Sequence, residues 1–236
     1  MLRNRLYSLY WDLLDLLFPP ACGGCNKPGV RWCVNCQSQA KVIRPPFCEI
    51  CGQPVASGCQ CQRCQKNRPT ITAIRSWAEF DGPVRNALHG LKYHRNVGLG
   101  IALSQHLVNL LQALNWAIDL VVPVPLSKER KKQSGYNQAD LLAKPLAYRL
   151  QLAYHPKVLF RVRETRSQVE LSLSERRENV KDAFRSDPQQ VNKKRVLVID
   201  DVTTTGSTLD ACASALFAAK AKSVYGITLA RATPKG

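Results

Sequence analysis

The stretch Arg195-Val-Leu-Val-Ile-Asp-Asp-Val-Thr-Thr-Thr-Gly-Ser-Thr-Leu209 decides how this chain of 236 residues folds. The four apolar residues 196–199 predict a short buried strand, because the run is too brief for a helix and is rich in β-branched side chains. Asp200 and Asp201 are expected where that strand ends. A turn and a helix follow in the pattern, and the helix has apolar residues at helical spacing on one side.

The turn after this strand has the composition of an anion-binding site. Residues 202–206 are rich in hydroxyl groups, and Ser207 or Thr208 is predicted to cap the helix. In an open α/β sheet, ligands bind at the carboxyl ends of strands, beside helix N-termini whose N–H groups favour anions. Two adjacent carboxylates are costly unless a cation or hydroxyl donors meet them. A purely structural strand–turn–helix unit is the alternative interpretation.

The same stretch closely resembles the phosphoribosyl-pyrophosphate (PRPP) signature of type I phosphoribosyltransferases. It is not a P-loop, since no Gly-Lys-Ser/Thr follows, and a single glycine does not make a dinucleotide fingerprint. The resemblance implies that Asp200 and Asp201 hold the ribose 2′- and 3′-hydroxyls, with Mg²⁺ bound together with PRPP. It also implies that the 5′-phosphate is surrounded by Thr203, Thr204, Thr205, Gly206, Ser207 and Thr208.

A basic loop precedes this signature at a matching place in the predicted sheet. Residues 119–125 are predicted as a strand, and residues 126–135 follow it as a loop rich in Lys and Arg. A loop after a parallel strand lies at the same sheet edge as the Asp200 turn, although basic loops are usually only solvated. In phosphoribosyltransferases the corresponding loop holds pyrophosphate. The resemblance makes Ser127, Lys128 and Arg130 the matching residues.

The alternation of strands and helices from residue 71 onward predicts a parallel α/β sheet. Strands are expected at 71–80, 119–125, 196–199 and 223–229, with helices between them. We expect three parts: an amphipathic N-terminal helix (1–20), a Cys-rich zinc-binding domain (21–68) and a domain with the fold of type I phosphoribosyltransferases (69–236).

Nine of the ten cysteines lie between positions 22 and 64. Four Cys-x-x-Cys pairs predict two structural zinc ions, each held by two pairs. The expected ligands are Cys22, Cys25, Cys33, Cys36, Cys48, Cys51, Cys61 and Cys64. The pattern leaves open whether the pairs combine sequentially or in a cross-brace, and whether Cys59 replaces Cys61. Iron–sulfur ligation is one alternative. A disulfide scaffold is the other, and it requires export and leaves one cysteine unpaired. His89, His94 and His106 lack metal-like spacing and are expected at the surface or as caps.

The charge balance indicates a polyanionic partner. The 34 Lys and Arg residues exceed the 17 Asp and Glu residues, which gives a formal charge of +17. Two four-cysteine zinc sites would remove roughly four units of this charge. The sequence has no stretch of eighteen apolar residues that would predict a membrane span, so a cytoplasmic location is expected. The leucine-striped helix 1–20 is predicted to pack on the body, to lie peripherally on a membrane or to bind a partner.

Taken together, the chain resembles the ComF family of competence-associated, phosphoribosyltransferase-like proteins. The resemblance is carried by the cysteine pairs, by Val122-Pro-Val-Pro-Leu126 with Gly135-Tyr-Asn-Gln138, by Thr165-x-x-Gln168-x-x-Leu171 with Glu175-Arg-Arg-x-Asn179, and by Val198-Ile-Asp-Asp-Val-Thr-Thr-Thr-Gly206. It implies a PRPP-type site beside a zinc ribbon. It also implies handling of single-stranded DNA in natural transformation or DNA utilisation, with DNA-processing proteins as further partners.

Three functions fit these expectations. The first is a DNA-handling protein with a PRPP site, and the second is an active Mg²⁺-dependent phosphoribosyltransferase whose acceptor is unknown. The third is a zinc-stabilised adaptor with a vestigial pocket. Delivery of ammonia from glutamine is not expected, because a glutaminase domain needs an N-terminal nucleophilic cysteine and this sequence has Leu2 after Met1.

Overall fold

A five-stranded sheet forms the centre of the molecule, with the strand order β1-β7-β6-β2-β3 and every neighbouring pair parallel. The computed structural model describes residues 19–93, 96–127, 129, 134–163, 180 and 182–232. Nearly all of the predicted helix 1–20, and the polar stretch 165–179 that carries part of the ComF resemblance, lie outside the described residues. The predicted parallel α/β sheet is confirmed.

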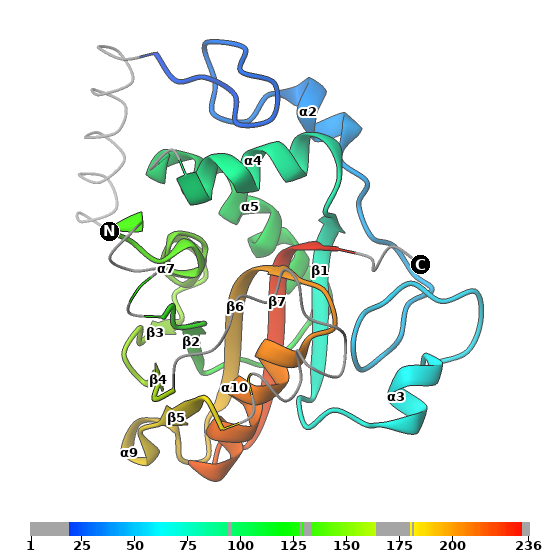
Figure 1. The fold of residues 1–236 in the computed structure, drawn as a ribbon, viewed down its shortest axis with the longest axis vertical. Coiled ribbons are helices and arrows are strands. Elements are labelled where there is room, and N and C mark those ends of the chain that lie inside the picture. The colour runs from blue at the N-terminus through cyan, green and yellow to red at the C-terminus, as the bar shows by residue number, and fades with distance from the viewer. Residues whose placement is uncertain are drawn as a thin grey trace.

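From β1 onward, strands and helices follow one another as the sequence pattern predicts, except in residues 153–186, where the described elements are all strands (Figure 1). The sheet strands are β1 (Ala73–Glu79), β2 (Leu120–Pro123), β3 (Ala153–Tyr154), β6 (Arg195–Thr203) and β7 (Ser223–Arg231). The helices are α2 (Val34–Gln39), α3 (Gln62–Lys66), α4 (Gly82–Tyr93), α5 (Val97–Leu114), α7 (Gln138–Arg149), α9 (Pro188–Val191) and α10 (Ser207–Ala218).

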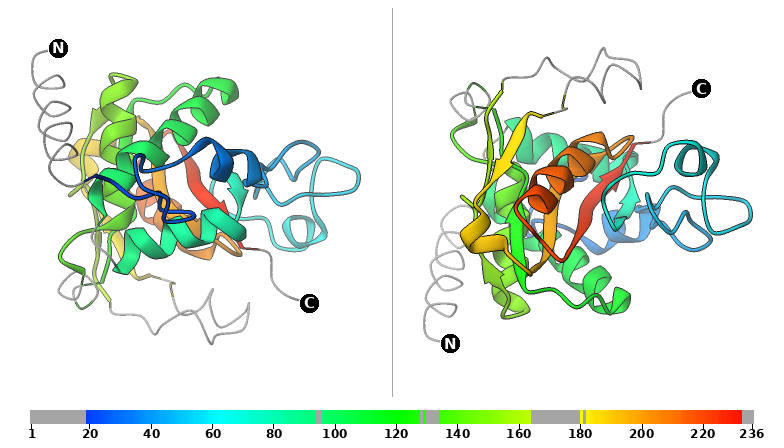
Figure 2. Two further views of the ribbon diagram at one scale, coloured as in Figure 1. Left: turned by 90° about the horizontal axis from the view of Figure 1, so that it is seen from above. Right: turned by 90° about the horizontal axis from the view of Figure 1, so that it is seen from below.

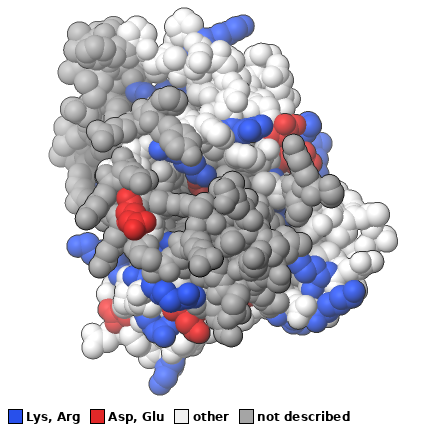
Figure 3. All heavy atoms as spheres, viewed as in Figure 1, with Lys and Arg blue, Asp and Glu red and all other residues white. Residues whose placement is uncertain are grey.

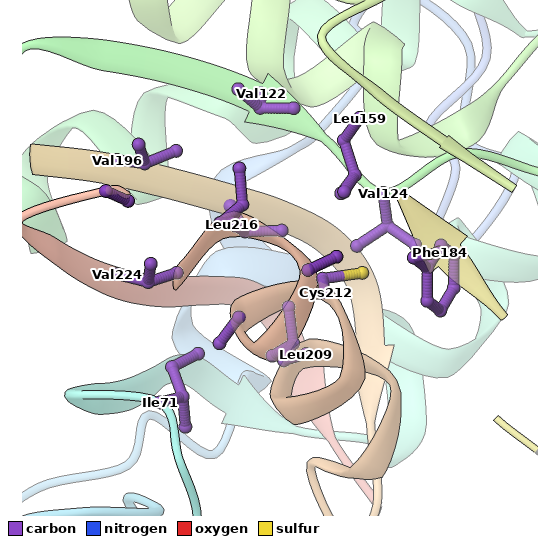
Figure 4. Packing of buried hydrophobic residues seen from close by; sticks show 14 of the residues in the cluster. Ile71, Val122, Val124, Leu159, Phe184, Val196, Leu209, Cys212, Leu216 and Val224 are labelled. Atoms are coloured by element: carbon purple, nitrogen blue, oxygen red, sulfur yellow. The ribbon is translucent and has the colours of Figure 1, made fainter. Parts of the chain in front are cut away.

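Strand β6 is buried on both faces, as its continuous apolar run predicts. Val196 and Val198 point into a core beneath α10, together with Leu209 and Cys212 (Figure 4). Leu197 and Ile199 point the other way, into a second core formed with α4, α5 and α7. The period-2 alternation of the strand therefore places helices on both faces of the sheet and fixes the direction in which β6 ends.

Two details of the predicted strand–turn–helix unit are wrong. Strand β6 does not end at residue 199 but continues to Thr203, because its later residues still pair with β7, for example Val202 with Ala230. Neither Ser207 nor Thr208 caps α10. The cap is Gly206, whose φ of 82° is left-handed, a conformation that glycine adopts without steric cost.

A small antiparallel pair was not predicted. Strands β4 (Leu159–Arg161) and β5 (Phe184–Ser186) pair with each other outside the main sheet. Phe184 packs in the core beneath α10. Each strand has only three residues, which is too short for a periodic pattern to reveal.

The cysteine-rich part contacts the body at two separate places. Residues 22–36 lie over α4, at the top of Figure 1, and residues 48–64 lie beside β1. Both views in Figure 2 show this second segment projecting from the side of the body. Between the two segments, residues 41–43 run along β1: Ile43 N–H donates to the carbonyl oxygen of Trp77 at 3.0 Å, and Glu79 N–H donates to that of Lys41 at 2.9 Å.

The second segment, residues 48–64, also forms a backbone hydrogen bond with β1. The N–H of Ile74 donates to the carbonyl oxygen of Ile50 at 2.6 Å. Because β1 is the outermost strand on its side of the sheet, these contacts satisfy groups that no neighbouring strand reaches. Among the described helices, none has the length and apolar character needed to cross a membrane.

Candidate functional site

The two carboxylates of the signature lie in the last part of β6, half-buried at the carboxyl edge of the sheet. Asp200 Oδ1 accepts a hydrogen bond from the N–H of Asp201 at 2.9 Å, and Asp201 Oδ1 accepts one from the N–H of Val202 at 2.7 Å. The Nζ atom of Lys92, near the end of α4, lies 3.0 Å from Asp201 Oδ2. A basic side chain from a distant element therefore partly balances this pair of acids.

The environment of Asp200 disfavours its charged form in the absence of a ligand. Burial raises its pKa well above the usual range, and the neighbouring Asp201 carboxylate raises it further, while Lys92 acts in the opposite direction. A cation or a set of hydroxyl donors would lower this pKa again. Carboxylate oxygens are also the ligands that Mg²⁺ prefers, so the donor set fits either Mg²⁺ or ribose hydroxyls.

The turn between β6 and α10 presents hydroxyl groups at the start of a helix. Thr205 Oγ1 accepts a hydrogen bond from the N–H of Ser207 at 3.2 Å and lies 2.7 Å from Ser207 Oγ. The cap residue Gly206 has no side chain to bond the first turn. The positive end of α10 therefore lies beside hydroxyls and amides, an arrangement that suits a phosphate group.

The basic loop begins at the same edge of the sheet. Strand β2 pairs with β6 in parallel and ends at Pro123, opposite Ile199, so the chain leaves β2 beside the residue that precedes Asp200. Ser127 is buried just beyond β2, and Asn137 donates to the carbonyl oxygen of Val124 at 2.9 Å, which ties the end of the loop to its start. Lys128 and Arg130 lie outside the described residues. The predicted site residues that are described thus meet at one edge.

The eight predicted zinc ligands form two groups in the sequential pairing. Cys22, Cys25, Cys33 and Cys36 form the first cluster, and Cys48, Cys51, Cys61 and Cys64 form the second. Within each cluster the four Sγ atoms all lie within 4.8 Å of one another, which is the spread expected of thiolates around one tetrahedral ion. Cys61 belongs to the second cluster, whereas Cys59 is exposed and outside it. The cross-brace alternative is therefore not the arrangement found.

The backbone around each cluster favours the thiolate form of one cysteine. Burial raises the pKa of Cys22, but hydrogen bonds from the backbone of Cys33, Gly24 and Cys25 outweigh it and bring the pKa to about 6. Burial also raises the pKa of Cys48, but hydrogen bonds from the backbone outweigh this effect and lower the pKa to about 6. Since metals bind the thiolate, each cluster contains a sulfur that is prepared for zinc.

Two basic residues at this edge were not predicted as site residues. Lys92 reaches Asp201 from α4, and Arg231 at the end of β7 donates to the carbonyl oxygen of Thr204 at 3.1 Å. Arg231 had a signal in the sequence, because an arginine directly follows a buried apolar strand at the edge where β6 also ends. No sequence signal would have brought Lys92 to Asp201, since that contact depends on the packing of α4.

Comparison with known proteins agrees with both halves of this description. Residues 13–65 match the double zinc ribbon domain, and residues 132–235 match the phosphoribosyl transferase domain. The two cysteine clusters fit the two sites of such a ribbon. The fold and its cysteines thus define a phosphoribosyltransferase-like domain joined to a double zinc ribbon.

Curated relatives match most of the length of this chain. "DNA utilization protein YhgH" of Salmonella typhimurium is 33% identical over 204 residues, covering 82% of this chain and 89% of the relative. "Competence protein F" of Haemophilus influenzae is 31% identical, covering 75% and 80%. "Competence protein ComFC" of Bacillus subtilis is 29% identical, covering 87% and 86%. The chain belongs to the ComF family of competence and DNA utilisation proteins.

Proposed function

We propose that this protein binds PRPP or a related ribose phosphate, together with Mg²⁺, and handles single-stranded DNA. In this proposal Asp200 and Asp201 contact the ribose hydroxyls and Mg²⁺. Residues 203–208 surround the 5′-phosphate, and Ser127, Lys128 and Arg130 contact the pyrophosphate. The observation that carries the proposal is the meeting of the acidic end of β6, the hydroxyl-rich turn and the positive end of α10 at one edge of the sheet.

The DNA part of the proposal is supported by charge and by family membership. The chain has a formal charge of +17, and relatives carry names that refer to competence and DNA utilisation. Lys and Arg side chains cover the lower right of the face in Figure 3, where the second cysteine segment lies. Lys66, the last residue of α3, and Arg68 are exposed. Such a surface favours contact with a phosphate backbone.

Calorimetric titration of PRPP, with and without Mg²⁺, tests the binding site. We expect saturable binding that requires or is strengthened by Mg²⁺. The double variant Asp200→Asn/Asp201→Asn should lose about 1.5–3 kcal/mol of binding free energy for each charged hydrogen bond removed. The matched control is Asp182→Asn, which removes an exposed carboxylate at a residue whose φ of 55° asparagine tolerates. Equal affinity of the double variant and the control would contradict the proposed site.

Titration of single-stranded DNA at several salt concentrations tests the DNA part separately. The logarithm of the binding constant should fall with the logarithm of salt concentration, with a slope of about −0.7 for each phosphate neutralised. No binding at low salt would exclude DNA handling while leaving the PRPP site untouched. If PRPP also fails to bind, the adaptor with a vestigial pocket becomes the better description.

Turnover is a separate question, answered by release of pyrophosphate from Mg²⁺-PRPP in the presence of bases, nucleotides and amines. In an active phosphoribosyltransferase the nucleophile displaces pyrophosphate at C1′. The residues of this chain would act by positioning the ribose and stabilising the leaving charge. Release above background with one acceptor would identify the substrate class. A background rate with all of them would support a binding role.

A further inference from the structure

Arg231 is a buried arginine that connects two functional parts of the molecule. It is only 3% exposed. Its Nη1 donates to the carbonyl oxygen of Thr204 in the turn after β6, and its Nη2 donates to the carbonyl oxygen of Cys51 in the second cluster. Among the described residues, no carboxylate forms an ion pair with it, and its Nε has no hydrogen-bond partner. A buried cation of this kind needs a compensating negative charge.

The second cluster supplies that charge. A zinc ion with four thiolates carries about −2, so the cluster with its metal is the anionic group next to Arg231. The guanidinium group therefore has two roles at once. It balances the metal site electrostatically, and its fork of N–H groups bridges the cluster backbone to the turn. The ammonium group of a lysine is a compact point charge without this planar fork, so it cannot form the hydrogen bonds to Cys51 and Thr204 in the same geometry.

The bond to Thr204 also sets the direction of the next amide. A trans peptide unit is planar, and its C=O and N–H groups point in opposite directions. Because the carbonyl oxygen of Thr204 is held by Arg231, the N–H of Thr205 points away from Arg231 and from the ribbon. Arg231 thus fixes the orientation of an amide within the turn that is proposed to surround the 5′-phosphate.

Ile74 makes a second connection between the second cluster and the turn. The N–H of Ile74 bonds the carbonyl oxygen of Ile50, between the second cluster's first two ligands. A Cβ on Gly52 would lie 2.3 Å from the carbonyl oxygen of Ile74, so the cluster backbone packs directly on β1. A Cβ on Gly206 would lie 2.7 Å from Ile74 Cδ1. Ile74 therefore contacts both the cluster and the turn.

We propose that Arg231 is a positioning residue that couples the second zinc cluster to the turn 203–206, so that phosphate ligands bind tightly only when this cluster holds its metal. This inference rests on the proposed ribose-phosphate site. The first cluster has no such connection among the described residues: its backbone is held by α4, where Asn86 donates to the carbonyl oxygen of Gly24 at 3.0 Å.

The decisive experiment compares variants in PRPP titration, with zinc content measured by mass spectrometry. Arg231→Lys should keep two zinc ions and lose at least tenfold in PRPP affinity. The matched control is Arg75→Lys. Arg75 also donates to the cluster backbone, at the carbonyl oxygen of Glu49 (2.9 Å), but within the described part of the chain none of its hydrogen bonds reaches the turn. Arg75→Lys should change the affinity less than threefold. Equal affinities for the two variants would overturn the proposal.

A second comparison removes one metal at a time. Cys61→Ser and Cys33→Ser change the third ligand of the second and first clusters, and both cysteines are half-buried. Cys61→Ser should lose one zinc ion and most PRPP affinity, whereas Cys33→Ser should lose one zinc ion and keep the affinity. If the Cys61 variant binds PRPP as tightly as the wild type while holding one zinc ion, the coupling is absent.

A third measurement does not depend on PRPP. Amide hydrogen exchange at Asp210, whose N–H donates to the carbonyl oxygen of Gly206 in the turn at 2.9 Å, should become at least tenfold faster in Arg231→Lys than in the wild type, with the exchange of the β6 core residues unchanged. Failure of the wild type to bind PRPP would refute the proposed function, and this exchange would still decide the coupling. Unchanged exchange at Asp210 would refute the coupling even if PRPP binds.

Discussion

The two cysteine clusters have the same ligands and similar spacing, yet they are attached to different parts of the molecule. Eight positions separate the inner ligands Cys25 and Cys33, and ten separate Cys51 and Cys61. The first cluster packs on the helical layer, where a Cβ on Gly23 would lie 2.4 Å from Leu99 Cδ2. The second cluster packs on the edge of the sheet and reaches the turn after β6. Similar metal sites can therefore have different consequences for function.

Removing one metal at a time should produce the largest effect and the clearest separation. Cys36 and Cys64 are both the fourth ligand of their cluster and both 1% exposed, so Cys36→Ser and Cys64→Ser are a matched pair. Each variant should lose one zinc ion, whose binding contributes on the order of 10 kcal/mol to local folding. Hydrogen exchange should rise in α4 and α5 for Cys36→Ser, and in β1 for Cys64→Ser. The same regional pattern in both variants would contradict the comparison.

A glycine at the contact between the second cluster and the sheet should give the next largest effect. Gly52 has a φ of 70°, and an added Cβ would meet the Ile74 backbone at 2.3 Å. Gly58, in the same segment, has a φ of 82° with nothing within 4 Å. Gly52→Ala should therefore lose at least about 3 kcal/mol of stability and Gly58→Ala about 1 kcal/mol. Chemical unfolding of both variants measures the difference, and similar losses would show that the contact is not tight.

The smallest effect is expected on the side of the first cluster, at His106. Its ring stacks on Trp77 with 4.0 Å between ring centroids, and its Nε2 is buried without a hydrogen-bond partner among the described residues. Burial lowers the pKa of His106 to about 4. The unfolded chain takes up a proton near pH 6.5 and the folded chain does not, so stability should fall as the pH drops from 6.5 towards 4.

Replacing His106 with phenylalanine tests this pH dependence. His106→Phe keeps an aromatic ring beside Trp77 and removes the proton-binding nitrogen. Between pH 7 and pH 5.5 the variant should lose about 1 kcal/mol less stability than the wild type. Thermal unfolding at both pH values gives the measurement. Equal losses in the two proteins would show that other groups determine the acid sensitivity.

Four of the five strands of the sheet, the burial of residues 196–199 and the eight cysteines that form the two clusters followed from the sequence. They depend on local patterns: apolar runs in 196–199 and 223–229, and cysteine pairs three residues apart. The division of the chain at residue 68 and the role of each site residue stay predictions. His106 was expected at the surface or as a cap, but it is half-buried, because its ring stacks on Trp77 in a tertiary contact that has no pattern in the sequence.

The pairing of the clusters and the contacts of Lys92 and Arg231 could not be predicted for a related reason. Four similar cysteine pairs are chemically equivalent, so only the path of the chain between them selects the sequential arrangement. Lys92 and Asp201 are brought together by the packing of α4 on the sheet. Arg231 reaches Cys51 across 180 positions of sequence. Such contacts depend on the whole fold and leave no local trace.

The cover that residues 41–43 and Ile50 provide along β1 has a consequence for solubility. An uncovered outer strand offers unpaired N–H and C=O groups to another chain and is a common starting point for aggregation. At the opposite side of the sheet, β3 has only two residues and offers little to pair with. Within the described part of the chain, the double zinc ribbon therefore protects the longer of the two edges of the sheet. Shortage of zinc should make this protein self-associate through β1 while the rest of the sheet is still folded.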